Sequence, residues 1–197
     1  MVPKKENYKK KIYVLKLIAI IQVLTLLSLL SRAEELVSLK DFLKKELSHS
    51  TKLSKEIIQL SKEQKEEVSK LAPNSSDDSY TFYYGKDNNG KMEKACTVIV
   101  QAGKEGPISL GTCFNSSGIL DSVTILSHEE ERGKKITSEN FLKQFKGKKA
   151  TDAFVLGSDM DGISGASYSS KSISEALRRS AFAFRTMIKG KENEIKK

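Results

Sequence analysis

The sequence predicts an α+β fold, in which an antiparallel sheet with flanking helices is preceded by one N-terminal transmembrane helix and a helical spacer. Three observations predict it: short segments of alternating apolar residues between residues 80 and 126, a long amphipathic pattern near the C-terminus, and a Leu-rich uncharged run near the N-terminus. The expected organisation is a basic cytoplasmic tail at 1–11, a transmembrane anchor at 12–31, a helical spacer at 32–73, the main domain at 74–190 and a charged tail at 191–197.

The composition is that of one folded domain with an appendage, because the 197 residues are 38% hydrophobic and 30% charged. The net charge of +9 raises the question of a nucleic acid or an anionic membrane as partner. The lysines are spread along the chain, however, and the aromatic residues, 7% of the chain, are not interleaved with them. No nucleic acid is therefore expected. No metal is expected either, since the two Cys and two His lack the spacing of a zinc site.

The N-terminal segment has the pattern of a membrane anchor. Lysines crowd residues 1–11, and no charge occurs from Leu17 to Leu30. At about 1.5 Å per residue, the apolar run nearly crosses a hydrocarbon core of ~30 Å. The basic side stays cytoplasmic, so the remainder is expected outside. A cleaved signal peptide is the alternative, with Ser31-Arg32-Ala33 as a weak cleavage site, but no helix breaker separates the run from Glu34.

The segment from 33 to 72 predicts helix, because it holds no Gly or Pro and its Leu and Ile residues recur mostly at three- or four-residue spacing. A break is expected at 48–51, where Ser50 or Thr51 would cap a second helix. Residues 73–78 predict a turn or linker.

After residue 79 the period changes to that of strands joined by short turns, which predicts antiparallel hairpins. Strands are expected at 80–84, 95–101, 108–114 and 119–126. Beyond them the sequence predicts a short helix at 138–145, a short strand at 154–156 and an amphipathic helix at 172–189.

The two cysteines, Cys96 and Cys113, face each other if the second hairpin turns about Lys104 and Glu105. A disulfide is allowed outside the membrane. The alternative is a pair of buried thiols that act as small hydrophobic residues.

A turn rich in hydroxyls, Ser164 to Ser170, comes just before the long helix. Small residues let a bulky group approach the backbone, and a helix N-terminus offers free N–H groups to an anion. A hydroxyl here is suited to a phosphate ester. Taken by itself, the same pattern also describes an ordinary Ser-rich helix cap.

This turn resembles the Asp-x-x-Ser/Thr-Gly-Ala-Thr/Ser pattern that flavin transferases modify in the FMN-binding domain family. That family includes the G subunit of the Rnf electron-transport complex and the C subunit of the sodium-pumping NADH:quinone reductase. The resemblance implies covalent FMN, joined through its phosphate to the hydroxyl of Ser167, where the usual acceptor is Thr. The other residues that match the motif are Asp161, Ser164, Gly165, Ala166, Ser169 and Ser170.

A second block, residues 127–133, resembles the His-x-Glu-Thr-Pro-Gly segment of the same family. His128, Glu130 and Gly133 match, whereas Glu131 and Arg132 stand at the Thr and Pro positions. The resemblance implies that His128 and Glu130 line the cofactor. It continues through Phe141-Leu-x-Gln-Phe145-x-Gly147 and spans roughly residues 82 to 188.

The resemblance therefore implies a flavoprotein of the bacterial cell membrane, single-pass, with its FMN-binding domain at 74–190 on the extracytoplasmic side. It would pass electrons as a subunit of an Rnf/Nqr-like chain, rather than act as a stand-alone enzyme. Its partners would be a flavin transferase and other membrane electron-transport subunits. An anchored binding or structural module without flavin is the alternative. A Ser hydrolase is a third interpretation, but Gly165-Ala166-Ser167 lacks the Gly-x-Ser-x-Gly elbow.

Overall fold

The computed structural model describes residues 34–73, 75, 77–131 and 134–195. The chain divides into two compact units, 1–33 and 34–197. The predicted basic tail and transmembrane anchor, residues 1–31, lie outside the described residues. Within the described part of the chain, no helix combines the length and the apolar character that crossing a bilayer requires.

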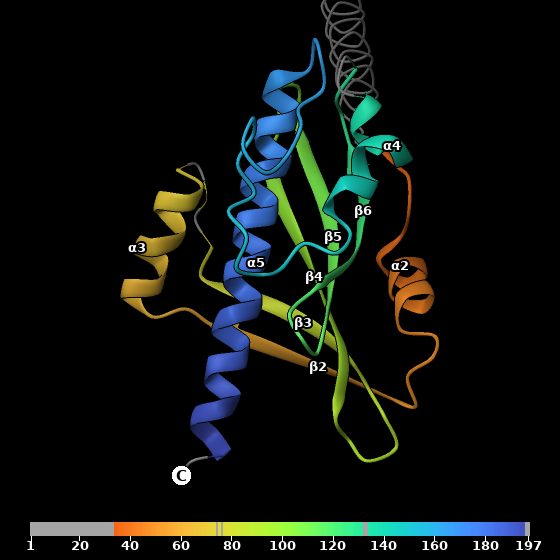
Figure 1. Cartoon of the computed structure of the whole chain (residues 1–197), viewed down its shortest axis with the longest axis vertical. Helices are drawn as coiled ribbons and strands as arrows, with labels where there is room; N and C mark the ends of the chain where they lie inside the picture. Colours follow the sequence, from red (N-terminus) through yellow and green to blue (C-terminus); the bar gives the residue numbers. More distant parts are fainter. Residues whose placement is uncertain (1–33, 74, 76, 132–133, 196–197) are drawn as a thin grey trace, which may run out of the picture. The chain divides into compact units, whose positions relative to one another are not determined.

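The domain is built on a six-stranded antiparallel sheet whose strand order is β1-β6-β5-β4-β3-β2. Apart from β1 at one edge, neighbours in the sheet are neighbours in the chain. Short turns join β3 through β6, whereas a longer connection that contains a helix joins β2 to β3. Figure 1 shows this arrangement. The strands are β1 (Glu34–Glu35), β2 (Lys52–Gln59), β3 (Ser79–Lys86), β4 (Met92–Ala102), β5 (Pro107–Asn115) and β6 (Leu120–His128).

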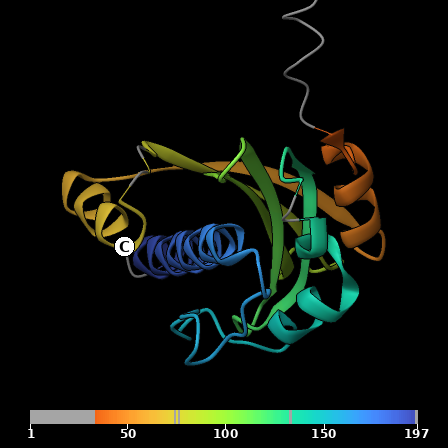
Figure 2. The same ribbon diagram turned by 90° about the horizontal axis from the view of Figure 1, so that it is seen from above.

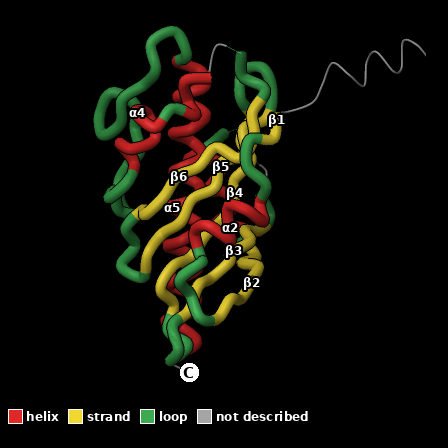
Figure 3. The backbone as a smooth tube through the Cα atoms, turned by 90° about the vertical axis from the view of Figure 1, so that its right-hand side faces the viewer, coloured by secondary structure: helices red, strands yellow, loops and turns green. Residues whose placement is uncertain are grey.

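Helices lie on both faces of the sheet. The long helix α5 packs on β4 and β5, and α3 packs beside α5. The short helix α2 lies on the opposite face, near β6 (Figures 2 and 3). The helical segments are α2 (Leu39–Glu46), α3 (Lys62–Leu71), the 3-10 turn η1 (Lys134–Thr137), α4 (Glu139–Leu142), the 3-10 turn η2 (Lys143–Phe145) and α5 (Ser167–Ile195).

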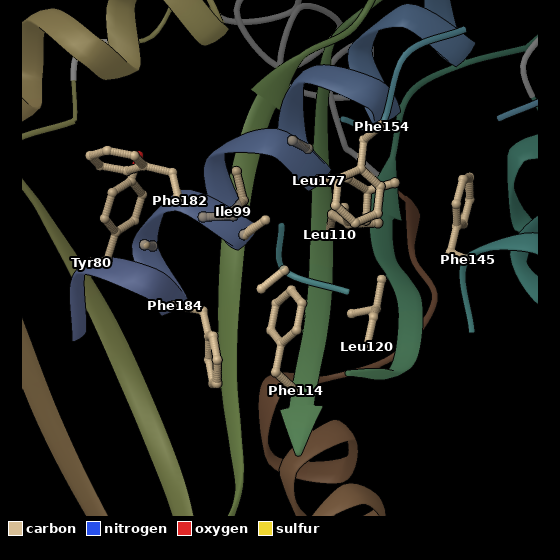
Figure 4. Close-up of a cluster of buried hydrophobic side chains, with 14 of the residues drawn as sticks. Tyr80, Ile99, Leu110, Phe114, Leu120, Phe145, Phe154, Leu177, Phe182 and Phe184 are labelled. Carbon is tan, nitrogen blue, oxygen red and sulfur yellow. The ribbon is translucent and has the colours of Figure 1, made fainter. Parts of the chain in front are cut away.

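The main core fills the space between α5 and the sheet. Ile173, Leu177 and Phe184 recur on one face of α5 and are almost fully buried, as the amphipathic pattern predicts. Phe184 stacks on Phe114 of β5, with ring centroids 4.8 Å apart. Figure 4 shows Leu177, Phe184 and Phe114 between the helix and the strands. This packing fixes the position of α5, and therefore of the turn that precedes it.

A smaller core on the opposite face contains a disulfide between Cys96 and Cys113. The two residues are register partners on β4 and β5, so the predicted hairpin register is confirmed and the pair is oxidised. Phe42 of α2 covers this face and approaches so closely that a Cβ atom at position 111 would lie 2.7 Å from its ring. Gly111 therefore makes room for α2.

The predicted helical spacer at 32–73 is wrong at 52–59, which form strand β2 and pair with β3 over their whole length. Leu53 and Ile57 are spaced by four residues, which suits one face of a helix. Four is also a multiple of the two-residue period of a strand, and both side chains lie on the exposed face of β2. The β-branched Ile57 and Ile58 favour the strand.

Two further differences concern the C-terminal half. The expected strand at 154–156 is wrong, because this segment is irregular and only Leu156 makes an isolated bridge, to Met160 across the turn at 157–159. The expected charged tail after residue 190 is helical as far as Ile195, because residues 191–195 contain no Gly or Pro to end the helix. The other predicted strands and the helical segment at 138–145 are confirmed, with shifted ends.

Candidate functional site

The hydroxyl-rich turn, residues 161–170, lies at the start of α5. Helix α5 begins at Ser167, whose side chain is exposed, and Ser164 and Gly165 before it are exposed too. Ala166 is 6% exposed and anchors the turn. The turn thus presents small side chains and hydroxyls outward on a buried support.

The first turn of α5 has no conventional cap. The hydroxyls of Ser164 and Ser167 have no hydrogen-bond partner among the described residues, and the backbone amides of Ser167, Tyr168 and Ser169 find no acceptor there either. A helix start with free amides attracts negative charge. The alternative of an ordinary Ser cap therefore does not describe this turn.

Other bonds hold the turn in shape. The Ser170 hydroxyl accepts from the Ile163 amide at 2.9 Å and donates to the Ala166 carbonyl at 3.0 Å, and it is fully buried. Gly165 has a φ of 79°, and no atom lies within 4 Å of where its Cβ would be. Glycine is therefore required here for its backbone conformation, and the space outside it is open.

Asp161, at the start of the motif, is fixed through its backbone. Its amide donates to Gln144 Oε1 at 2.7 Å, and its carbonyl accepts from Gln144 Nε2 at 3.3 Å. The Asp161 side chain itself is left exposed. Sequence reasoning missed the role of Gln144, although this residue stands in the Phe-Leu-x-Gln-Phe pattern that carries part of the resemblance.

Glu130 lies beneath the same turn and is only 2% exposed. Its Oε1 accepts from the amides of Lys104 and Glu105 at 2.6 and 3.0 Å, and its Oε2 accepts from the hydroxyl of Ser169. The carboxylate therefore joins the β4–β5 turn to the first turn of α5. Sequence reasoning found Glu130 through its motif, but not these partners, which lie 25 to 39 residues away.

His128 ends strand β6 and is 4% exposed. Its Nδ1 accepts from the Glu130 amide at 3.1 Å, so its ring shapes the backbone that carries Glu130. The predicted pair His128 and Glu130 is thus brought close to Ser169, two residues along α5 from Ser167.

The loop that leads into the motif carries its own charged contact. Burial by itself acts to raise the pKa of Asp159. Hydrogen bonds from the Val155 and Phe154 amides, together with the nearby Lys148, have the larger combined effect, so the pKa lies below its ordinary value. These bonds hold Phe154 at a φ of 49°, which is unusual for a residue other than Gly. Asp159 therefore fixes the chain just before Asp161.

Fold and site together define an α+β domain that presents a free hydroxyl, with open amides around it, at the start of a long helix. Residues 103–181 match the model of the family described as the FMN-binding domain, so this part of the chain is similar to that family. The matched segment contains the whole hydroxyl-rich turn, Glu130 and the β5–β6 hairpin.

Two solved structures are similar to this chain, and the first of them shares the fold. NqrC from Shewanella oneidensis has a TM-score of 0.52 and 14% identity, with 74% of this chain and 88% of that chain covered. The Na⁺-translocating NADH-quinone reductase of Parabacteroides distasonis has a C subunit with a TM-score of 0.49 and 20% identity, covering 68% and 76%. No curated protein matches the chain.

The residues at the turn fit the phosphate end of FMN. Ser167 supplies an exposed hydroxyl, three amides are free to donate to phosphate oxygens, and Gly165 leaves open space beside them. Lys171, one helical turn later, has a 68% exposed side chain and pairs with Glu175 at 3.9 Å, so it adds positive charge that is partly offset. The donor set is therefore that of an anion site beside one exposed hydroxyl.

Proposed function

We propose that this protein is a membrane-anchored flavoprotein that carries FMN as a phosphate ester on Ser167. It passes electrons as a subunit of an Rnf/Nqr-like electron-transport chain, and its FMN-binding domain lies on the extracytoplasmic side of a bacterial cell membrane. The observation that carries the proposal is the Ser167 hydroxyl beside three amides, all without a partner in the part of the chain that the structure describes.

FMN, when bound, supplies the one- or two-electron chemistry. The chain's own residues bind and orient it. Ser167 provides the ester oxygen, and the amides of Ser167 to Ser169 donate to the phosphate, whose charge the helix dipole stabilises. Ser164 and Gly165 keep the approach to the backbone open, while Ala166, Ser170 and the Asp161 backbone hold the turn.

The exposure of the motif supports a flavin transferase as partner. A modifying enzyme has to reach Ser167, and the residues on either side of it, Ser164, Gly165 and Tyr168, are exposed. The family match, together with the fold shared with NqrC, supports other electron-transport subunits as further partners.

The experiment is intact-mass measurement of the full chain expressed with and without a flavin transferase. The expected mass gain is one FMN less one water, present in the wild type and in Ser167→Thr and absent in Ser167→Ala. Ser117→Ala, an exposed serine in the β5–β6 turn, is the matched control and should load fully. Loading of Ser167→Ala, or a wild type that gains no mass, contradicts the proposal.

The anchor has its own test. The proposal expects the loaded protein in the membrane fraction, resistant to alkaline washing, with residues 12–31 still present. A mature chain that begins near Glu34 contradicts the anchor but leaves the FMN site standing.

A further inference from the structure

We infer that Glu130 and Ser169 form a clamp that turns Ser167 outward and so positions it as the FMN acceptor. Both are positioning residues, since neither would form the ester itself. The inference rests on the proposed function and assigns a role to the buried Ser169 hydroxyl of the motif.

Helix geometry relates the direction of the Ser169 side chain to that of Ser167. Successive residues of an α-helix are rotated by about 100°, so residues two apart point in nearly opposite directions. Ser169 is 2% exposed and its hydroxyl donates to Glu130. Holding Ser169 inward therefore directs Ser167 outward, where it is exposed.

The Glu130 carboxylate is itself held in place by the β4–β5 turn. Glu130 Oε1 accepts two adjacent amides of the β4–β5 turn, those of Lys104 and Glu105. At Gly103, a Cβ atom would lie 2.3 Å from this oxygen and 2.6 Å from the Gly106 carbonyl. The turn is therefore shaped around the carboxylate, and Gly103 is part of the clamp.

The serines of the motif differ in whether a modifying enzyme can reach them. A hydroxyl that is buried and bonded to Glu130 is not presented to a partner, whereas Ser164 and Ser167 are. Ser169 therefore acts on FMN attachment through Glu130, by ordering the first turn of α5. The Ser172 hydroxyl, which donates to the Ala102 carbonyl at 2.8 Å, fixes the next turn of the helix in the same way.

The chain offers a matched control for Ser169. Ser180 is also a buried serine of α5, and its hydroxyl is paired with that of Thr112 on β5. It lies 11 residues beyond Ser169, about 16 Å along the helix. Ser180→Ala therefore removes a comparable hydrogen bond without touching the start of α5.

The experiment measures the initial rate of FMN gain by purified, folded full-length variants incubated with a flavin transferase and its flavin donor, together with their melting temperatures. Ser169→Ala and Glu130→Ala should load at least about tenfold more slowly than wild type. Ser180→Ala should lose stability but load within about twofold of wild type. Glu130→Gln should load nearly normally, since its amide oxygen accepts from the turn and its NH₂ donates to Ser169.

A readout without flavin keeps the inference falsifiable if loading is limited elsewhere. In the unmodified protein, Ser169→Ala should speed amide hydrogen exchange at Ser170, whose amide donates to the Ala166 carbonyl, and Ser180→Ala should not. A wild type that loads while Ser169→Ala and Glu130→Ala load equally fast overturns the clamp and leaves the proposed function intact. Slow loading of Ser169→Ala with normal loading of Glu130→Ala would show direct recognition of Ser169, which also overturns it. A wild type that does not load overturns the proposed function itself.

Discussion

Helices α3 and α5 both have serine at the N-terminal end, yet their first turns are built differently. At α3, the Ser61 hydroxyl accepts from the Gln64 amide at 3.3 Å, and the Gln64 side chain accepts from the Ser61 amide at 2.8 Å. This is a complete capping box. At α5, neither Ser164 nor Ser167 caps any amide among the described residues.

The difference separates two uses of the same residue type. A serine that caps a helix has its oxygen occupied by the fold, whereas the Ser167 oxygen is free for chemistry. The amides left open at α5 are the ones an anion would satisfy. Stability and FMN loading should therefore be separable, and four variants test whether they are.

The largest expected stability effect lies in the disulfide on the opposite face of the sheet. Replacing Cys96 and Cys113 by Ala should lower the free energy of unfolding by about 2 to 4 kcal/mol, because the cross-link restrains the unfolded chain. Urea denaturation followed by circular dichroism measures it. The folded variant should still load FMN, and loss of loading in a folded sample would show that the two faces are coupled.

The capping box of α3 should have the next effect. Ser61→Ala removes the hydroxyl that accepts from Gln64, which should cost about 1 kcal/mol of unfolding free energy. Loading measured by intact mass should be unchanged. An unchanged stability would mean that this cap is not what holds α3 in place.

Most of the sheet could be predicted from the sequence, because the signals for its strands and turns lie in short segments of the chain. Short turns and a two-residue period specify β3 to β6, and even the pairing of Cys96 with Cys113 follows from where one turn lies. Strand β2 was missed because the spacing of Leu53 and Ile57 fits a helix and a strand equally, and only pairing with β3 decides it.

The site divides in the same way. Ser167 and Ser169 lie in one short motif, so resemblance could find them. The contacts of Gln144 with Asp161 and of Glu130 with Lys104 join residues far apart in the chain. No local pattern contains such pairs, since they depend on how η2, the end of β6 and the β4–β5 turn pack.

A smaller effect of pH should come from the turn before α5. The lowered pKa of Asp159 means that its stabilisation is present above its ordinary pKa of 3.8 and is lost as the pH falls through the folded value. The loss should be under about 1 kcal/mol, because the side chain is 26% exposed.

The matched variant for this effect is Asp159→Asn, which cannot titrate. The free energy of unfolding is measured between neutrality and about pH 2, which includes the range in which Asp titrates. As the pH is lowered, it should fall more steeply for wild type than for Asp159→Asn. Equal slopes would contradict the role of this carboxylate. Asp159 accepts from the amides of Phe154 and Val155 and not from those of the first turn of α5, so its carboxylate stabilises the preceding loop and leaves the helix amides open.

The smallest effect should be that of Ser167→Ala on the unmodified protein. The hydroxyl is exposed and bonded to nothing among the described residues, so its removal should change the unfolding free energy by less than about 0.5 kcal/mol. Urea denaturation without a transferase measures this. A loss as large as that of Ser61→Ala would mean that Ser167 is a cap after all.

Peptide mapping of the loaded protein tests most directly whether Ser167 carries FMN. Trypsin should release residues 150–171 as one peptide, bounded by Lys149 and Lys171, and this peptide contains five serines: Ser158, Ser164, Ser167, Ser169 and Ser170. Fragment masses from the loaded wild type should place one FMN on Ser167. FMN on any other serine, or a peptide without FMN in protein exposed to the transferase, would contradict the account.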